Sequence, residues 1–221
     1  PHLLKMPIDV ERDLIPVAPT ARVTSFLVVP AAFPAKSLAE FVTYVRANPG
    51  KLNYGSAGNG SQPHIATAMF ARAAKLDVVH VPYKGSTETL TALLGGQIDF
   101  TFDVGVAIAQ VKAGKLRLLG VYNTRRYPLI PDVPTVAESG VPGYEATAWS
   151  MLMVPAGTPR PVVERIHESA VKLLDNAEVK KRFAADGGEA VSSSGEQARK
   201  FLLAEIQRWA RVIKDAGVKA D

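Results

Sequence analysis

The feature that most constrains the fold is a regular alternation of short apolar segments with amphipathic ones between residues 37 and 121. The apolar segments are rich in β-branched residues and are predicted to be strands, at 52–55, 78–81, 98–102 and 116–121. Helices are predicted around them at 37–47, 61–73, 86–94 and 106–113. Alternation of this kind is typical of an α/β fold with a parallel sheet.

Two long extended runs flank this block. They are VTSFLVV at 23–29 and ATAWSMLMVP at 146–155. We interpret them as two crossings between lobes, so that residues 31–145 form one lobe, the second lobe, and residues 1–30 plus 146–221 form the first lobe. After the second run, helices are predicted at 158–174 and 176–185, followed by a long one from a capping box at Ser194 to Gly217. The inward face of the long helix is predicted to be Phe201, Leu202, Trp209, Val212 and Ile213, packed on the strand near 26–29.

The composition argues against several functional classes. Of the 221 residues, 26 are Lys or Arg and 21 are Asp or Glu, and these charges are interleaved rather than gathered in the basic stripe of a nucleic-acid module. The absence of cysteine excludes thiolate metal sites, and the four histidines lack metal-ligand spacing. We therefore expect no metal, no cofactor and no nucleic-acid partner.

The stretch LNYGSAGNGSQPH at 52–64 places three glycines between a predicted strand and a predicted helix. It is not a P-loop, because Gly60 is followed by Ser61 rather than by lysine. It is not a dinucleotide fingerprint either, because the third glycine of G-x-G-x-x-G is missing. Backbone N–H groups at a helix N-terminus favour an anion such as a carboxylate. A plain glycine-rich turn with Ser61 as an ordinary N-cap is the other interpretation.

Other candidate residues follow the predicted strands at the same sheet edge. Asp103 could face the ligand or cap the helix 105–113, and Lys84 could be a ligand or a solvated loop lysine. His64 lies on the helix that Ser61 opens. A catalytic triad of Ser61, His64 and Asp103 can be imagined, but no G-x-S-x-G elbow exists. A hydrolase-like enzyme is therefore the weaker alternative.

Six ordered motifs resemble the Bug family of periplasmic solute-binding proteins, which are associated with tripartite tricarboxylate transporters. The motifs are YGSAGNGSQPH, VHVPYKGS, LLGGQIDFTFD, AGKLRLLGV, PDVPTVAESGVPGYEATAW and VPAGTPRPVV. The resemblance implies an α/β, two-lobed type II periplasmic-binding fold with a hinge of two crossing strands. It also implies a cleft that closes on a small organic acid in the periplasm, for delivery to a membrane permease or sensor.

The same resemblance suggests which residues bind the ligand. They are Ser56, Ala57, Gly58, Asn59, Gly60, Ser61, His64, Tyr83, Lys84, Gly85, Asp103 and Trp149. The ligands implied are di- and tricarboxylates, acidic amino acids and aromatic carboxylates. Family members begin with a strand–loop–helix that this chain lacks, so the first lobe is expected to be incomplete. A remnant that no longer binds ligand is the remaining alternative.

Overall fold

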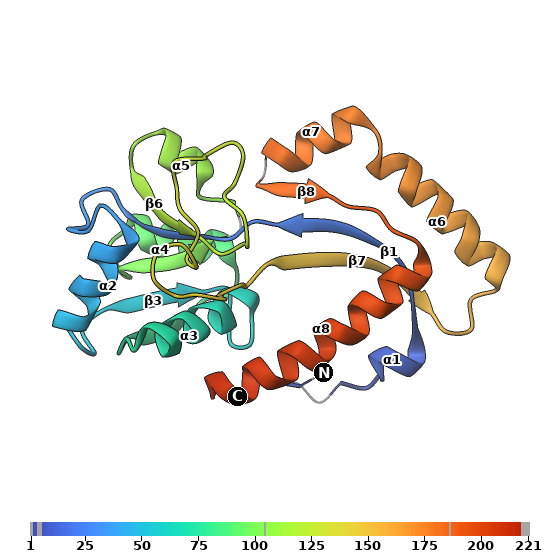
Figure 1. Cartoon of the computed structure of the whole chain (residues 1–221), viewed down its shortest axis with the longest axis horizontal. Helices are drawn as coiled ribbons and strands as arrows, with labels where there is room; N and C mark the ends of the chain where they lie inside the picture. The colour runs from blue at the N-terminus through green and yellow to red at the C-terminus, as the bar shows by residue number, and fades with distance from the viewer. Residues whose placement is uncertain (1, 4–5, 104, 186, 218–221) are drawn as a thin grey trace. The chain divides into compact units, whose positions relative to one another are not determined.

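The computed structural model describes residues 2–3, 6–103, 105–185 and 187–217. These residues divide into two compact units (Figure 1). Unit 1 contains the chain up to Val23 and again from Trp149 to Gly217, whereas unit 2 is the continuous stretch Thr24–Ala148. The chain therefore passes between the units twice, after Val23 and after Ala148.

Unit 2 is built on a five-stranded sheet. Its strands are β2 (Phe26–Pro30), β3 (Asn53–Ser56), β4 (Val79–Pro82), β5 (Phe100–Asp103) and β6 (Leu116–Val121), in the order β4-β3-β5-β2-β6. β3 pairs in parallel with β4 and β5, but β2 is antiparallel to both of its neighbours, β5 and β6. The strands predicted within the 37–121 block thus run in one direction, whereas β2, which the sequence assigned to a crossing outside that block, lies between β5 and β6 and runs opposite to them.

Helices cover both faces of this sheet. They are α2 (Leu38–Ala47), α3 (Gln62–Ala74), α4 (Ser86–Leu94) and α5 (Ile108–Lys112). All four apolar residues of β2 are fully buried; Leu27 and Val29 join the core beneath α2 and α3, and Phe26 and Val28 join the core beneath α4 and α5. Successive side chains of a strand point to opposite faces of the sheet, so β2 contributes residues to both cores. This is expected for a central strand that is buried on both faces.

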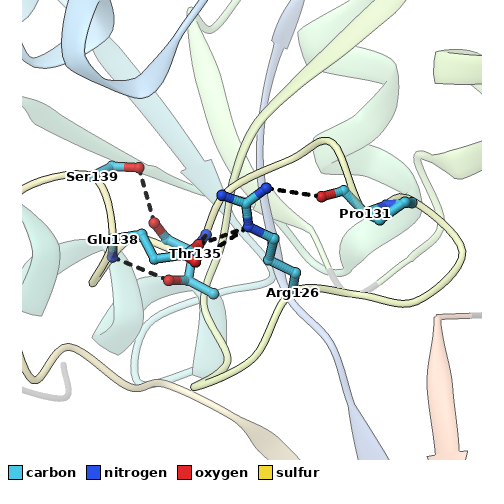
Figure 2. A network of polar contacts seen from close by, with 5 residues as sticks. All are labelled: Arg126, Pro131, Thr135, Glu138 and Ser139. Carbon is cyan, nitrogen blue, oxygen red and sulfur yellow. Dashed lines mark hydrogen bonds and ion pairs between the residues drawn. The ribbon is translucent and has the colours of Figure 1, made fainter.

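The 26 residues between β6 and β7 form an ordered loop with no helix or named strand. Figure 2 shows the contacts that hold it. Glu138 Oε2 accepts hydrogen bonds from the Thr135 backbone N–H at 2.7 Å and from Arg126 Nε at 3.0 Å, and Arg126 also donates to the Pro131 carbonyl. The Glu138 N–H in turn donates to Thr135 Oγ1 at 3.1 Å, and Ser139 Oγ to the Thr135 carbonyl. These side-chain bonds add to the backbone hydrogen bonds of the loop, such as the one from the Val136 N–H to the Val121 carbonyl at 2.8 Å.

Unit 1 contains a smaller sheet of three strands, β7 (Ala148–Pro155), β1 (Leu14–Val23) and β8 (Gly188–Ala190), in the order β7-β1-β8. Its helices are α1 (Val10–Asp13), α6 (Arg160–Leu174), α7 (Ala177–Ala185) and α8 (Gly195–Ala216). The central strand β1 was not predicted, because Pro16 and Pro19 interrupt its apolar pattern. The predicted strand 23–29 is instead two strands separated by Thr24 and Ser25.

The long helix α8 begins and ends as predicted. Ser194 and Gln197 form the capping box, and Gly217 closes the helix with φ 67°. The predicted inward face is only partly right, however. The buried line of α8 is Ala198, Leu202 and Glu205, and the helix packs on β1.

Candidate functional site

The strand directions of unit 2 bring the predicted loops to one edge of the sheet. Strands β3, β4, β5 and β6 all run in one direction and β2 runs opposite to them. The glycine loop 57–61, the turn 83–85, Asp103 and the segment after β6 therefore share an edge with Thr24 and Ser25, which precede β2. In open α/β sheets, ligands bind at the carboxyl ends of the strands.

The glycine loop is shaped by its own internal hydrogen bonds. Gly58 and Gly60 have φ values of 117° and 73°, which L side chains rarely adopt. Ser56 Oγ donates to the Gly58 carbonyl at 3.0 Å and accepts from the Gly58 N–H at 3.2 Å. The Ser61 N–H donates back to the Gly58 carbonyl at 3.1 Å. The loop is thus a compact turn that leads directly into α3.

Two stacked histidines contact the same loop. The imidazole rings of His64 and His80 lie 3.9 Å apart at an interplanar angle of 14°. His64 Nδ1 accepts from the Gly60 N–H at 3.1 Å, and His80 Nε2 lies 2.7 Å from Ser56 Oγ. The sequence did not single out His80. The available signal was strand pairing, since His80 is opposite Tyr54 in the parallel pair of β3 and β4.

The hydroxyl of Ser61 does not cap α3, although Ser61 occupies the N-cap position. Its Oγ is buried and has no hydrogen-bond partner among the described residues. A buried hydroxyl without a partner is costly, so such an atom marks a place where a ligand or a water can bind. Because α3 has 13 residues, its dipole favours negative charge beside this hydroxyl. Ser61 can therefore donate to an anion at the start of α3.

A polar cluster lies at the same edge, and none of its residues was predicted from the sequence to bind the ligand. Gln62 Nε2 donates to the Ala146 carbonyl at 2.8 Å and to Ser25 Oγ at 3.3 Å, and Asn123 Nδ2 donates to Thr24 Oγ1 at 3.0 Å. The side-chain oxygens of Gln62 and Asn123 are buried without partners in the described part of the chain. These oxygens can accept from a ligand hydroxyl or water. Thr24 and Ser25 look like ordinary strand residues, so no local pattern marks them.

Asp103 is oriented as a capping residue. Its Oδ1 accepts hydrogen bonds from the backbone N–H groups of Gly105 and Ala107, both at 2.8 Å, and the residue is only 4% exposed. Burial raises the pKa of its carboxyl, although the N–H bonds oppose that shift. These bonds serve the turn before α5. Ser61 Oγ has no hydrogen-bond partner among the described residues, so the triad imagined from the sequence does not form.

The remaining predicted residues differ in their surroundings. The Tyr83 ring lies over Gly55, where a Cβ atom would come within 3.4 Å of Tyr83 Cε2. Lys84 is exposed, and its backbone N–H donates to Glu88 Oε2 at 3.1 Å. Gly85 is the N-cap of α4 and offers no side chain. These three residues belong to unit 2, like the glycine loop.

Trp149 belongs to unit 1. Its indole N–H donates to Glu205 Oε2 at 2.7 Å, and its ring packs edge-on against Phe201 at 5.2 Å. Its polar atom is therefore engaged in joining β7 to α8.

Two further searches bear on function. Within the described residues, no three His, Asp or Glu side chains come together as a metal site would require. In the same part of the chain, no helix is both long and apolar enough to cross a membrane.

Comparison with known sequences identifies relatives over nearly the whole chain. The family model described as "Tripartite tricarboxylate transporter family receptor" matches residues 1–218. The UPF0065 protein of the tcbD-tcbE intergenic region in Pseudomonas sp. (strain P51) is 34% identical over 98% of this chain and 65% of its own length. Protein BugT of Bordetella pertussis is 32% identical over 97% of this chain and 66% of its own length. The chain thus spans just under two thirds of these relatives.

Solved structures give the same result. The R. palustris protein Rpa4515 with adipate has a TM-score of 0.93 and 32% identity, covering 99% of this chain and 74% of that one. MatC from Rhodopseudomonas palustris with bound malate has a TM-score of 0.86 and 31% identity, covering 96% and 74%. The predicted α/β periplasmic-binding-protein fold is confirmed. Because the family consists of binding receptors, the enzymatic alternative is excluded. The chain belongs to the Bug family of tripartite tricarboxylate transporter receptors.

Proposed function

We propose that this chain binds a small organic carboxylate at the glycine-loop edge of unit 2. In this proposal it is part of a periplasmic receptor that delivers the carboxylate to a tripartite tricarboxylate-type permease or to a sensor. Relatives with adipate and with malate support the ligand class. The family match supports the role in transport.

The observation that carries the proposal is the buried hydroxyl of Ser61, which has no hydrogen-bond partner in the described part of the chain. A carboxylate oxygen beside it would accept a charge-assisted hydrogen bond, which is stronger than a bond between neutral groups. The segment from Leu52 to His64 contains no Lys, Arg, Asp or Glu. Attraction for the anion would therefore come from hydrogen-bond donors and the dipole of α3 rather than from a charged side chain.

The choice of ligands for a test follows from this chemistry. Adipate and malate each carry two carboxylates and are the first to try. Acidic amino acids and aromatic carboxylates come next, because one carboxylate suffices for the Ser61 contact. Affinity differences among these acids would report on the part of the site beyond Ser61.

The test is the substitution Ser61→Ala, measured by calorimetry with adipate and malate. Because the Ser61 hydroxyl caps nothing, we expect an almost unchanged melting temperature. Loss of a hydrogen bond to a charged group, about 1.5–3 kcal/mol, should weaken binding about 10- to 100-fold.

Ser37→Ala is the matched control. Ser37 Oγ accepts from the Glu40 N–H and does cap its helix, α2. This substitution should lower stability by about 1 kcal/mol and leave affinity unchanged. Wild-type protein that binds none of these acids would contradict the proposal and favour a remnant that has lost binding. Equal affinity in wild type and Ser61→Ala would remove Ser61 from the site.

A further inference from the structure

In the glycine loop, the backbone N–H groups of Gly58 and Gly60 both donate hydrogen bonds within the protein. The Gly58 N–H donates to Ser56 Oγ at 3.2 Å, and the Gly60 N–H donates to His64 Nδ1 at 3.1 Å. A glycine-rich anion loop is expected to point such groups at its ligand. Here they are engaged by side chains instead. The glycines are therefore required for the shape of the loop, and other groups must meet the ligand.

These contacts determine the protonation of His64. A backbone N–H can only donate, so Nδ1 of His64 must accept with its lone pair. His64 is then neutral in this arrangement, with its proton on Nε2. The residue is only 9% exposed, and its ring stacks on His80. A side chain that accepts a hydrogen bond from the Gly60 N–H is thus part of the loop conformation.

His80 acts on Gly58 indirectly, because it contacts Ser56, and the Ser56 hydroxyl bonds to Gly58. Ser56 Oγ donates to the Gly58 carbonyl at 3.0 Å and accepts from the Gly58 N–H at 3.2 Å. His80 Nε2 lies 2.7 Å from the same oxygen, and the His80 tautomer determines which of the two donates. The His80 ring also stacks on Tyr54 at 4.8 Å. Ring packing alone explains the stack, but it does not explain why each ring places a nitrogen against a loop contact.

We propose that His64 and His80 are positioning residues for the ligand. They hold the glycine loop so that the ligand carboxylate meets the Ala57 N–H and the Ser61 hydroxyl rather than the N–H groups of Gly58 and Gly60. The Ala57 N–H has no acceptor among the residues that the structure describes. This proposal rests on the carboxylate-binding function proposed above and adds which donors make the contact.

The test compares His64→Asn with His64→Leu, using adipate and malate as the probes. Asparagine can place its Oδ1 near the former Nδ1 position and accept from Gly60, whereas leucine has a similar size and no acceptor. We expect His64→Asn to bind within about threefold of the wild type and His64→Leu to bind at least about tenfold more weakly, as for loss of one buried hydrogen bond. The amide proton resonance of Gly60 should shift strongly in His64→Leu and little in His64→Asn.

His167→Leu is the matched control, since His167 lies in unit 1, where Nδ1 contacts the Val17 carbonyl. It should bind both acids like the wild type. If His64→Leu does not fold, His80→Gln and His80→Phe provide a second pair: glutamine retains a donor for Ser56, and phenylalanine retains only the ring. Stronger binding by His80→Gln than by His80→Phe would support the proposal, and equal binding would contradict it.

The outcomes separate the two proposals. Unchanged affinity in a folded His64→Leu protein, or equal losses in His64→Asn and His64→Leu, would overturn the positioning role while leaving the proposed function intact. A wild type that binds neither acid would overturn the proposed function, and the positioning role with it.

Discussion

At the scale of single residues, the glycine loop depends on backbone conformation as much as on contacts. Gly60 has φ 73°, where a side chain strains the backbone by about 1–2 kcal/mol, and a β-branched one by more. We expect Gly60→Val to distort the loop and to abolish binding of adipate and malate, measured by calorimetry.

Gly157→Ala is the corresponding control. Gly157 lies outside the proposed site and is not among the glycines with positive φ, and nothing lies within 4 Å of the position that a Cβ atom would occupy. We expect this variant to fold and bind normally. A Gly60→Val protein that binds like the wild type would show that the loop conformation is not needed for the ligand.

Asp103 gives a prediction about stability. Asparagine can accept the same bonds from Gly105 and Ala107, so Asp103→Asn should change the free energy of unfolding by about 1 kcal/mol or less. Asp103→Ala leaves two N–H groups without an acceptor and should cost about 1–3 kcal/mol or more. Denaturant unfolding of both variants checks this. A greater loss of stability in Asp103→Asn than in Asp103→Ala would contradict the capping role.

The pH dependence of the Asp103 variants has a definite sign. Burial raises the pKa of the Asp103 carboxyl in the folded state above its unfolded value. The folded state therefore holds this proton more tightly, and stability falls as pH rises through the raised pKa. The Asp103→Asn variant should not show this part of the fall in stability with rising pH.

The residues of the site were unequally visible in the sequence. The glycine loop could be predicted because its conformation requires glycines at two nearby positions, 58 and 60, where φ is positive. His80, Ser25 and Gln62 could not, because their roles come from contacts between segments far apart in the chain, such as Gln62 with Ser25 and Ala146. Ser61 was identified at the right position with the wrong local role, since an N-cap pattern does not reveal whether the hydroxyl makes the bond.

At the scale of elements, β7 and α8 are joined by one buried carboxylate. Glu205 is 8% exposed and accepts hydrogen bonds from the indole N–H groups of Trp149 and Trp209, at 2.7 and 2.9 Å. Arg208 donates to both of its oxygens. Burial by itself raises the pKa of Glu205, but the bonds from Arg208 and Trp149 outweigh it, and the net pKa is lowered.

This arrangement predicts an acid-sensitive contribution to stability. Because the folded pKa of Glu205 is lowered, its contribution is present above the unfolded pKa and is lost as pH falls through the folded value. Glu205→Gln should therefore lower the free energy of unfolding at pH 7 by about 1–3 kcal/mol and make little difference in acid. Thermal melts of both proteins between pH 3 and 7 measure this. A difference that does not change with pH would contradict it.

The elements themselves followed from local signals where those signals were consistent. The helix predicted at 86–94 is α4, and the capping box at Ser194 begins α8. β1 was missed because it contains two prolines, although it is the central strand of its sheet. β2 was assigned to a crossing because an isolated apolar segment does not show which sheet it joins. The buried residues of α8 differ from the predicted ones in part because Glu205 is buried although it is charged, and an apolar pattern does not include a charged residue.

At the scale of the whole molecule, burial is distributed unevenly between the two units. Both large apolar cores lie within unit 2. In unit 1, the only buried residue of α6 is Leu174, and α7 has none among its described residues. Val162 and Leu173 of α6 are 46% and 60% exposed, beside an apolar groove of about 780 Å³ between α6, α7 and the strands.

This difference predicts an order of local unfolding. Segments with few buried apolar contacts open at lower free energy than core strands, so amide hydrogens of α6 and α7 should exchange faster than those of β2 and β5. Hydrogen exchange of the intact chain, followed by mass spectrometry, measures this order. Leu173→Glu, which adds charge at an exposed position, should leave exchange in β2 and β5 unchanged. Uniform protection across both units would contradict the prediction, because it would mean that they unfold as one cooperative body despite their separate cores.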